Sequence, residues 1–253
     1  MIVADFARYN PAHSEGNERA MSAGFEEEIR WWRSVLQTEE RPAWMAEALD
    51  PARRGGQSPP MLFDFVATLA LARPAKVLDV GCGPLSPLAW GAEQGLIEVV
   101  AVDPLADEYN ALLDELGVDY PIRPAVGRGE ALFEQFGQDF DFVYTRNALD
   151  HAHSPARCIE EICSVLRPGG LLYLEGFFNE GTRNRWGGLH QWDLAPACGV
   201  LTCTDPSGRR ADLTGNQALH CRFQRGPNRG QWFRMVFERL PKALNVAAGV
   251  TRG

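Results

Sequence analysis

Short apolar runs alternate with amphipathic stretches along the chain from residue 61 onward. Continuous apolar runs are typical of strands buried on both faces of a sheet, whereas apolar residues three and four apart indicate helices. Helical patterns cover 61–72, 106–116 and 155–166. This alternation predicts an α/β domain with a mostly parallel sheet and helices on both faces. The predicted strands cover 76–80, 98–102, 121–126, 141–146 and 171–175, and the third has the weakest pattern.

Residues 1–60 have a different pattern. A helical pattern extends over 24–49, with apolar residues at spacings of three and four from Phe25 to Leu36. Residues 51–60 are rich in Pro, Gly and Arg and are interpreted as a linker. We therefore predict a helical N-terminal extension, or cap, over 1–60 and a main domain over 61–253.

Beyond Glu175 the pattern changes to loops and hairpins. Residues 177–192 form a long loop with glycines and aromatic residues. Two hairpins are predicted after it, over 199–213 and over 219–240, each around a turn that contains Gly and Pro. We expect 177–215 to be an insertion on the side of the sheet where a substrate would bind.

The segment Val77-Leu78-Asp79-Val80-Gly81-Cys82-Gly83-Pro84 is an apolar run that ends in a glycine turn, and the next apolar run ends in Asp103 and Pro104. Ligands of open α/β sheets bind at the carboxyl ends of the strands. Glycines there let the backbone approach a ligand closely, and a strand-end carboxylate accepts hydrogen bonds from a ribose diol. The two segments therefore predict a nucleotide-type pocket with Asp103 at the ribose.

The glycine turn also separates two classes of ligand. A dinucleotide-binding turn has the pattern G-x-G-x-x-G, and here Ser86 stands in place of the third glycine. Asp79, inside the strand, would repel a pyrophosphate. S-adenosylmethionine (SAM) suits the site better, because it has an ammonium and a sulfonium at one end and a ribose and adenine at the other.

These residues resemble class I SAM-dependent methyltransferases, and they look most like the small-molecule group of the type 11 kind. The resemblance covers roughly residues 60–175. It rests on the two segments above and on matches at 129–132, 140–151 and 166–172. It implies a doubly wound, mostly parallel, seven-stranded Rossmann-like sheet with an antiparallel C-terminal strand, for which 231–240 is our candidate.

The resemblance also implies a cofactor site. Glu130 is expected to meet the adenine amino group and Asn147 to lie beside the methionine portion, while Asp79 reaches the ammonium through water or caps the amides of the turn. The cofactor-binding residues predicted in this way are Asp79, Gly81, Cys82, Gly83, Asp103, Pro104, Glu130, Ala131 and Asn147.

Three histidines lie near the carboxyl ends of the predicted strands. His151 and His153 follow the fourth strand, and His190 lies in the loop after the fifth. Histidine accepts protons near neutral pH, so His151 and His190 are candidate catalytic residues, although a base is needed only if the methyl acceptor loses a proton. Turn formation and packing remain open alternatives. We predict no metal site, because nothing in the sequence fixes a ligand geometry for these histidines.

Two tryptophans are candidate contacts of the methyl acceptor. Trp32 lies on the apolar stripe of the N-terminal helical pattern, and Trp192 lies in the 177–192 loop. Large rings offer contact area to an apolar substrate with few rotatable bonds. The alternative for both is that they only pack the extension and the loop against the sheet.

Composition excludes several classes of partner. The formal net charge of -8 argues against a nucleic-acid partner, because phosphate contacts need a basic surface. The sequence has neither a basic segment followed by an apolar one at its start nor an apolar run long enough for a membrane span. We therefore expect a cytoplasmic protein, a monomer or homodimer, with no membrane partner. In that compartment its six cysteines should be reduced thiols. None of them forms a C-x-x-C pair, so we expect no structural zinc site.

The sequence thus predicts a SAM-dependent methyltransferase that modifies an oxygen or nitrogen of a small, largely apolar metabolite. Two alternatives stay open. One is a protein of the same fold that binds the nucleoside in a regulatory or assembly role without methyl transfer. The other is a Rossmann-like enzyme with a nicotinamide cofactor, against which the missing third glycine and Asp79 argue.

Overall fold

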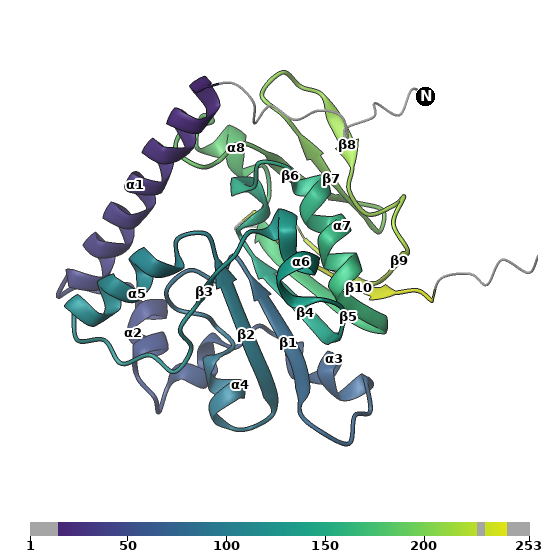
Figure 1. Ribbon diagram of the computed structural model, residues 1–253, viewed down its shortest axis with the longest axis horizontal. Coiled ribbons are helices and arrows are strands. Elements are labelled where there is room, and N and C mark those ends of the chain that lie inside the picture. The colour runs from purple at the N-terminus through teal and green to yellow at the C-terminus, as the bar shows by residue number, and fades with distance from the viewer. Residues whose placement is uncertain (1–14, 227–230, 242–253) are drawn as a thin grey trace, which may run out of the picture.

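The computed structural model describes residues 15–226 and 231–241. Seven strands form one sheet in the order β3-β2-β1-β4-β5-β10-β9, with helices around it (Figure 1). The strands are β1 (Ala75–Val80), β2 (Ile97–Asp103), β3 (Ala125–Val126), β4 (Phe140–Arg146), β5 (Leu166–Phe177), β9 (Leu219–Arg225) and β10 (Trp232–Arg239).

The pairing of the strands confirms the predicted fold class. β1 pairs in parallel with both β2 and β4, β2 pairs in parallel with β3, and β4 pairs in parallel with β5. β10 coincides with the predicted C-terminal strand and runs antiparallel to β5. A second antiparallel strand, β9, pairs with β10 and forms the edge of the sheet. The turn predicted between β9 and β10 includes 227–230, which lie outside the described residues.

Alternating side chains of the strands form two cores, one on each face of the sheet. In β4, Phe142 and Tyr144 enter one core and Val143 enters the other. The first core also contains residues of α3 (Leu62–Thr68), α4 (Ala89–Glu93) and α5 (Ala106–Glu115). The second contains residues of α6 (Leu132–Phe136) and α7 (Pro155–Val165). Helices therefore cover both faces, as the alternating pattern predicts.

The N-terminal helical pattern forms two helices, α1 (Glu15–Gln37) and α2 (Ala43–Leu49), and Pro42 directly precedes the second. Leu36 of α1 and Met45 of α2 are buried in the same core as α3, α4 and α5. Figure 1 shows α1 as a long helix at the edge of the molecule, beside α5. The extension thus packs directly on the main domain, and the boundary at residue 60 stays a prediction.

The segment 51–60, interpreted as a linker, is packed against the rest of the chain. A short 3-10 helix, η3 (Arg54–Gln57), lies within it, and Arg54 is only 2% exposed. Arg54 donates a 2.7 Å hydrogen bond to the carbonyl of Ala48 and pairs with Glu93 at 2.5 Å. Its guanidinium also lies over the ring of Tyr120. Composition alone does not reveal this anchor, because an arginine in a Pro- and Gly-rich stretch is usually solvated.

Two predicted boundaries shift for identifiable reasons. The third strand covers only Ala125–Val126, because Pro121 and Pro124 lack the N–H groups that a longer ladder needs. The helix predicted over 61–72 ends at Thr68, and Ala70 beyond it has a positive φ of 49°.

The chain after β5 forms a short helix and a second sheet. Helix α8 (Glu180–Arg183) is followed by β6 (Asp193–Ala197), β7 (Val200–Thr204) and β8 (Arg210–Asp212), which form a three-stranded antiparallel sheet. The predicted hairpin over 199–213 corresponds to β7 and β8. Leu194, Leu201 and Cys203 attach this sheet to the core of α6 and α7. Within the described residues, no helix has the length and apolarity that a membrane crossing needs.

Candidate active site

A cavity of about 920 Å³ opens at the carboxyl ends of β1, β2 and β4. The strand order reverses between β1 and β4, and ligands of doubly wound sheets bind at such a point. The volume lies at the upper end of the range for small-molecule pockets, so the cavity has room for a cofactor and a second molecule. Its wall includes residues of α1 and α2 from the N-terminal extension.

The glycine turn after β1 forms the floor of the cavity, and its two glycines are constrained differently. Gly81 and Gly83 have φ angles of 69° and 61°, which residues with a side chain rarely adopt. A Cβ at Gly81 would lie 2.3 Å from the Cβ of Ala148, so Gly81 is required by the protein's own packing. A Cβ at Gly83 would lie 3.3 Å from the ring of Trp32. Gly83 therefore keeps open the gap between the turn and α1.

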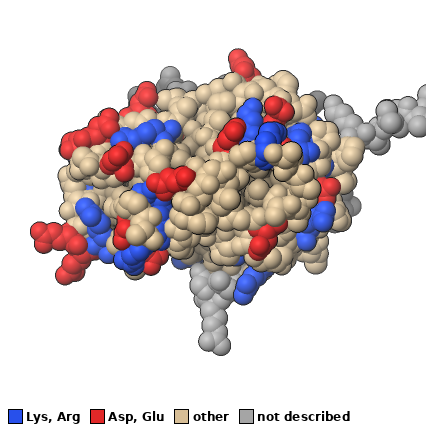
Figure 2. Space-filling view, turned by 90° about the horizontal axis from the view of Figure 1, so that it is seen from below, with Lys and Arg blue, Asp and Glu red and all other residues tan. Residues whose placement is uncertain are grey.

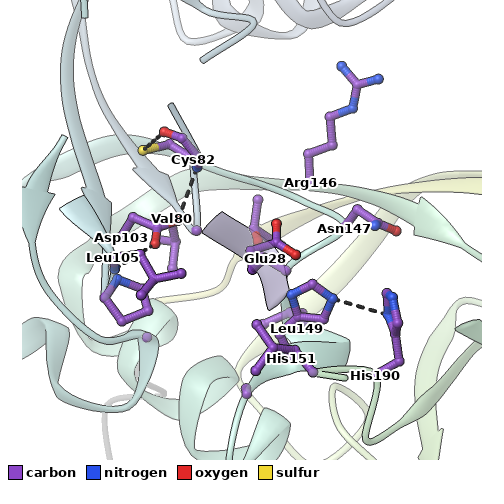
Figure 3. Close-up of a pocket in the computed structure, with 18 of the residues that line it drawn as sticks. Glu28, Val80, Cys82, Asp103, Leu105, Arg146, Asn147, Leu149, His151 and His190 are labelled. Carbon is purple, nitrogen blue, oxygen red and sulfur yellow. Dashed lines mark hydrogen bonds between the residues drawn. The ribbon is translucent and has the colours of Figure 1, made fainter. Parts of the chain in front are cut away.

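Asp103 stands at the end of β2, beside the turn (Figure 3). Its Oδ2 accepts a 3.0 Å hydrogen bond from the Gly83 N–H, and its Oδ1 accepts a 2.9 Å hydrogen bond from the Leu105 N–H. Burial raises the pKa of Asp103 to about 6, although both backbone hydrogen bonds lower it. The carboxylate is thus oriented at the cavity wall, where it can still accept from a diol.

Asp79 is buried in β1 beneath the turn. Burial raises its pKa to about 7, and a 2.5 Å hydrogen bond from the Ser86 hydroxyl opposes that shift. The Ser86 oxygen in turn accepts from the Leu88 N–H, so Asp79 acts on the following backbone through Ser86. Cys82 lines the cavity next to it, and burial raises the pKa of its thiol well above the usual value. A buried carboxyl at this position suits a cationic ligand group.

Residues predicted for the adenine and methionine ends are placed as follows. Glu130 lines the cavity, and its Oε1 accepts a 3.2 Å hydrogen bond from the Ser154 N–H. Asn147, with a φ of 50°, also lines the cavity, and its Oδ1 accepts from the Phe177 N–H at 3.2 Å. Pro104 is at the wall as predicted, but Ala131 is not among the lining residues. The prediction for Ala131 is corrected, since the 3-10 helix of 129–131 brings only Gly129 and Glu130 to the cavity.

His151 and His190, the candidate catalytic residues, meet across the cavity from Asp103 (Figure 3). His151 ends a 3-10 helix, η5 (Leu149–His151), just after β4, and His190 lies in the loop between α8 and β6. Nε2 of His151 lies 3.1 Å from Nδ1 of His190, and the same Nδ1 lies 2.7 Å from Oδ2 of Asp150. Burial lowers the pKa of His190, but the hydrogen bond and charge of Asp150 outweigh it and raise that pKa overall. The cluster thus places two imidazoles at the wall of the cavity.

Asp150 was missed by the sequence interpretation. It is nearly fully buried and forms the centre of the pair of histidines. The only signal was its position between a strand exit and His151, where a turn-forming acid is equally common. His153 also lines the cavity but is not part of this cluster.

The interpretation of Trp192 as an acceptor contact is wrong. Trp192 is 5% exposed, belongs to the core of α6 and α7, and does not line the cavity. Its indole N–H donates a 2.8 Å hydrogen bond to the carbonyl of Ala152. The backbone N–H of the neighbouring Gln191 donates a 2.9 Å hydrogen bond to the backbone carbonyl of Asp150. Trp192 therefore fixes the loop of His190 to η5.

Trp32 does line the cavity, as predicted for an acceptor contact. It lies edge-to-face with Trp31, Trp44 and Tyr109, and its N–H donates to Glu28 at 2.9 Å. Since Trp32 also lies over Gly83, its ring borders the part of the cavity next to the glycine turn. Its role toward an acceptor stays a prediction.

We expect Trp192→Ala to lower the free energy of unfolding by about 3–5 kcal/mol, because a buried indole and its hydrogen bond are lost. Trp31→Ala is the matched control, since Trp31 is 48% exposed and should cost much less. Denaturant unfolding of both variants measures the difference. Equal stability of Trp192→Ala and the parent chain would show that Trp192 does not anchor the loop.

SAM affinity should fall as the pH drops through 6. The pKa of Asp103 is raised to about 6, so acid protonates the carboxylate that accepts from the ribose diol. Between pH 7 and pH 5 its ionised fraction drops roughly tenfold, and the affinity should drop by about as much. The stability of the free protein should change in the opposite direction. Because the pKa of Asp103 is higher in the folded protein than in the unfolded chain, ionisation of Asp103 lowers the free energy of unfolding as the pH rises from about 4 through 6. Calorimetry at several pH values, with Asp103→Asn as the control that lacks this titration, measures the effect. An equally steep pH profile in Asp103→Asn would contradict it.

Comparisons with known proteins identify the family of the chain. The model of a methyltransferase-domain family matches residues 55–224. The chain is similar to a ubiquinone biosynthesis O-methyltransferase of Xanthomonas campestris pv. campestris (strain B100), with 31% identity over 151 residues, 57% of this chain and 55% of that relative. It is also similar to a tRNA U34 carboxymethyltransferase of Saccharophagus degradans, with 31% identity over 116 residues, 45% of this chain and 35% of the relative. The chain spans about half the length of the first of these relatives and less of the second.

Among solved structures, the [4+2]-cyclase SpnF has a similar fold, with a TM-score of 0.52 and 14% sequence identity over 87% of this chain and 96% of that one. At this identity the likeness shows the fold alone. The family match covers more than half of the chain, and the sheet has the parallel core and antiparallel C-terminal strands that the motifs predict. The chain therefore belongs to the methyltransferase-domain family and to the class I SAM-dependent methyltransferases, a family of enzymes.

Proposed function

We propose that the chain transfers a methyl group from SAM to an oxygen of a small, largely apolar molecule, with nitrogen as the alternative acceptor atom. One observation carries the proposal. One cavity has the Asp103 carboxylate and the glycine turn on one side and His151 and His190, with Asp150 hydrogen-bonded behind them, on the other. Binding of the methyl donor and the acceptor in one cavity would align them for the transfer.

The residues present fit SAM. Gly83 leaves a gap between the turn and Trp32 that a Cβ would narrow, and Asp103 and Glu130 supply acceptors for hydroxyl and amino groups. When bound, SAM supplies a methyl group already activated on a sulfonium. The protein's own work is then to hold Asp103 ionised at the ribose, to exclude water, and to stabilise the deprotonated acceptor at the histidine cluster.

Aromatic side chains support a small apolar acceptor. Phe25, Trp31, Trp32 and Trp44 from the N-terminal helices, with Phe177 and Trp232 from the sheet, line the cavity. Such rings bind apolar surface without losing many rotamers. A relative described as an O-methyltransferase of ubiquinone biosynthesis fits an oxygen acceptor. We propose that the aromatic side chains of the N-terminal helices select the acceptor.

Two other functions are candidates, one with RNA as the methyl acceptor and one without methyl transfer. A relative described as a tRNA carboxymethyltransferase points to RNA. Against RNA, the net charge is -8, and basic and acidic side chains are interspersed on the face in Figure 2. Binding of SAM in a regulatory or assembly role, without methyl transfer, is the second candidate. A cytoplasmic location and a monomer or homodimer remain our expectations.

Transfer of tritiated methyl groups from SAM tests the function. We expect label in small phenols or alcohols and none in transfer RNA. His190→Ala should reduce turnover strongly while SAM affinity stays near that of the parent chain. His220→Gln is the control, since His220 lies exposed on β9, away from the cavity. SAM binding without transfer to any acceptor of the panel would favour the binding role, and label in RNA alone would overturn the small-molecule acceptor.

A further inference from the structure

Three potential ligand atoms converge at the acceptor side of the cavity. Oδ2 of Asp150 lies 2.7 Å from Nδ1 of His190 and 3.4 Å from Nε2 of His151, and the two nitrogens are 3.1 Å apart. Each residue contributes one of these three atoms. Figure 3 shows the two imidazole rings next to each other with a nitrogen of each at the contact, and the rings meet edge-on at 68°.

Two of these separations, 3.1 Å and 3.4 Å, match a coordination shell, and the 2.7 Å between Asp150 and His190 would have to widen by about 0.3 Å when an ion binds. Ligands bound about 2.1 Å from one ion, at angles between octahedral and tetrahedral, lie about 3.0–3.4 Å apart. Hydrogen bonding satisfies the cluster less well. The Nδ1–H of His190 can donate to Asp150, and Nε2 of His151 then lies 3.1 Å from that nitrogen and 3.4 Å from the carboxylate oxygen, which is long for a second hydrogen bond. A cation satisfies all three lone pairs at once.

We propose that Asp150, His151 and His190 bind one divalent first-row transition-metal ion. The set of two imidazoles and one carboxylate suits zinc, iron, cobalt or manganese, whereas magnesium and calcium prefer oxygen ligands alone. This set differs from the three histidines considered in the sequence, because Asp150 takes the place of His153.

The ligands are held in place before any ion binds. Asp150 and His151 are adjacent on η5. Hydrogen bonds from Gln191 and Trp192 hold the loop that carries His190 against this 3-10 helix. The Asp150 side chain is 2% exposed, whereas those of His151 and His190 are 21% and 24% exposed. Both histidines also line the cavity. A bound ion would therefore have protein on one side and free coordination positions toward the acceptor.

The role of the ion rests on the proposed function. An acceptor hydroxyl that binds the ion loses its proton to solvent more readily, because the ion stabilises the oxyanion. A lone pair of that oxygen then forms the new O–CH₃ bond while the C–S bond breaks, and the electron pair of that bond stays on sulfur. The sulfonium thus becomes a neutral thioether, and one proton is released for each methyl group transferred.

Cobalt(II) binding to the full chain, after dialysis against a chelator, tests the site directly. We expect one cobalt ion per chain, with visible absorption bands of nitrogen and oxygen ligands and without thiolate charge transfer. His190→Gln should weaken binding by more than about tenfold, and His220→Gln should bind like the parent chain. Thermal unfolding of each variant verifies that it is folded.

Equal cobalt affinity of the parent chain and His190→Gln, or a thiolate spectrum, would overturn the metal site. If metal-free protein transfers methyl groups at the full rate and His190→Gln does not, the metal proposal fails while the proposed function stands. If cobalt binds at the three residues but SAM does not bind, the metal site stands and the proposed function fails.

Discussion

Asp103→Ala should weaken SAM binding by roughly ten- to a hundredfold. This loss corresponds to about 1.4–2.8 kcal/mol, close to the contribution of one charge-assisted hydrogen bond, and the substitution removes the acceptor of the ribose hydroxyls. The same carboxylate holds the Gly83 and Leu105 amides, so its loss also frees the glycine turn. Both effects act on the cofactor side of the cavity.

Calorimetry with SAM measures the loss, and Asp107→Ala is the matched control. Asp107 is an exposed acid in the first turn of α5, four residues from Asp103, so its removal changes the net charge equally. We expect it to bind SAM within about twofold of the parent chain, a difference well under 1 kcal/mol. Unchanged SAM affinity in folded Asp103→Ala would contradict the assignment of Asp103 to the ribose.

Gly83→Val should reduce SAM affinity by more than about a hundredfold. The residue has a φ of 61°, which a β-branched side chain resists, and the added atoms would fill the gap below Trp32. The ligand and the valine would then compete for the same space.

Gly95→Val separates these two causes. Gly95 has a similar φ of 65°, but a Cβ there meets nothing within 4 Å. The control therefore carries the backbone strain without the obstruction, and it should lose stability but keep SAM affinity. Thermal unfolding and SAM titration of both variants give the comparison. Near-parental SAM binding by Gly83→Val would mean that the turn does not approach the ligand.

The strand-end motifs could be predicted from the sequence because each is local. The turn at Gly81 and Gly83 is recognised from the residues around it, and so is the acid at Asp103. Parallel pairing of β1 with β2 then brings the turn and the acid together. β10 could be predicted from the hairpin pattern of 219–240 together with the family resemblance, which implies an antiparallel C-terminal strand. Both predictions depend on short segments of sequence.

Other features depend on contacts between distant segments. Trp192 stands in a glycine-flanked loop, but whether its ring faces the cavity or the core is decided by α7 and β6, which lie before and after it in the chain. Arg54 is buried because Glu93 and Tyr120 surround it. Asp150 gained its role only when the loop of His190 packed against η5. No single sequence window contains both halves of these contacts.

A crystal structure with S-adenosylhomocysteine bound tests the central claim most directly. The account predicts the ribose hydroxyls at the Asp103 carboxylate, the adenine near Glu130, and the methionine portion beside Asn147, with the sulfur facing His151 and His190. A product nucleoside bound elsewhere, or bound with its sulfur turned away from the two histidines, would contradict it.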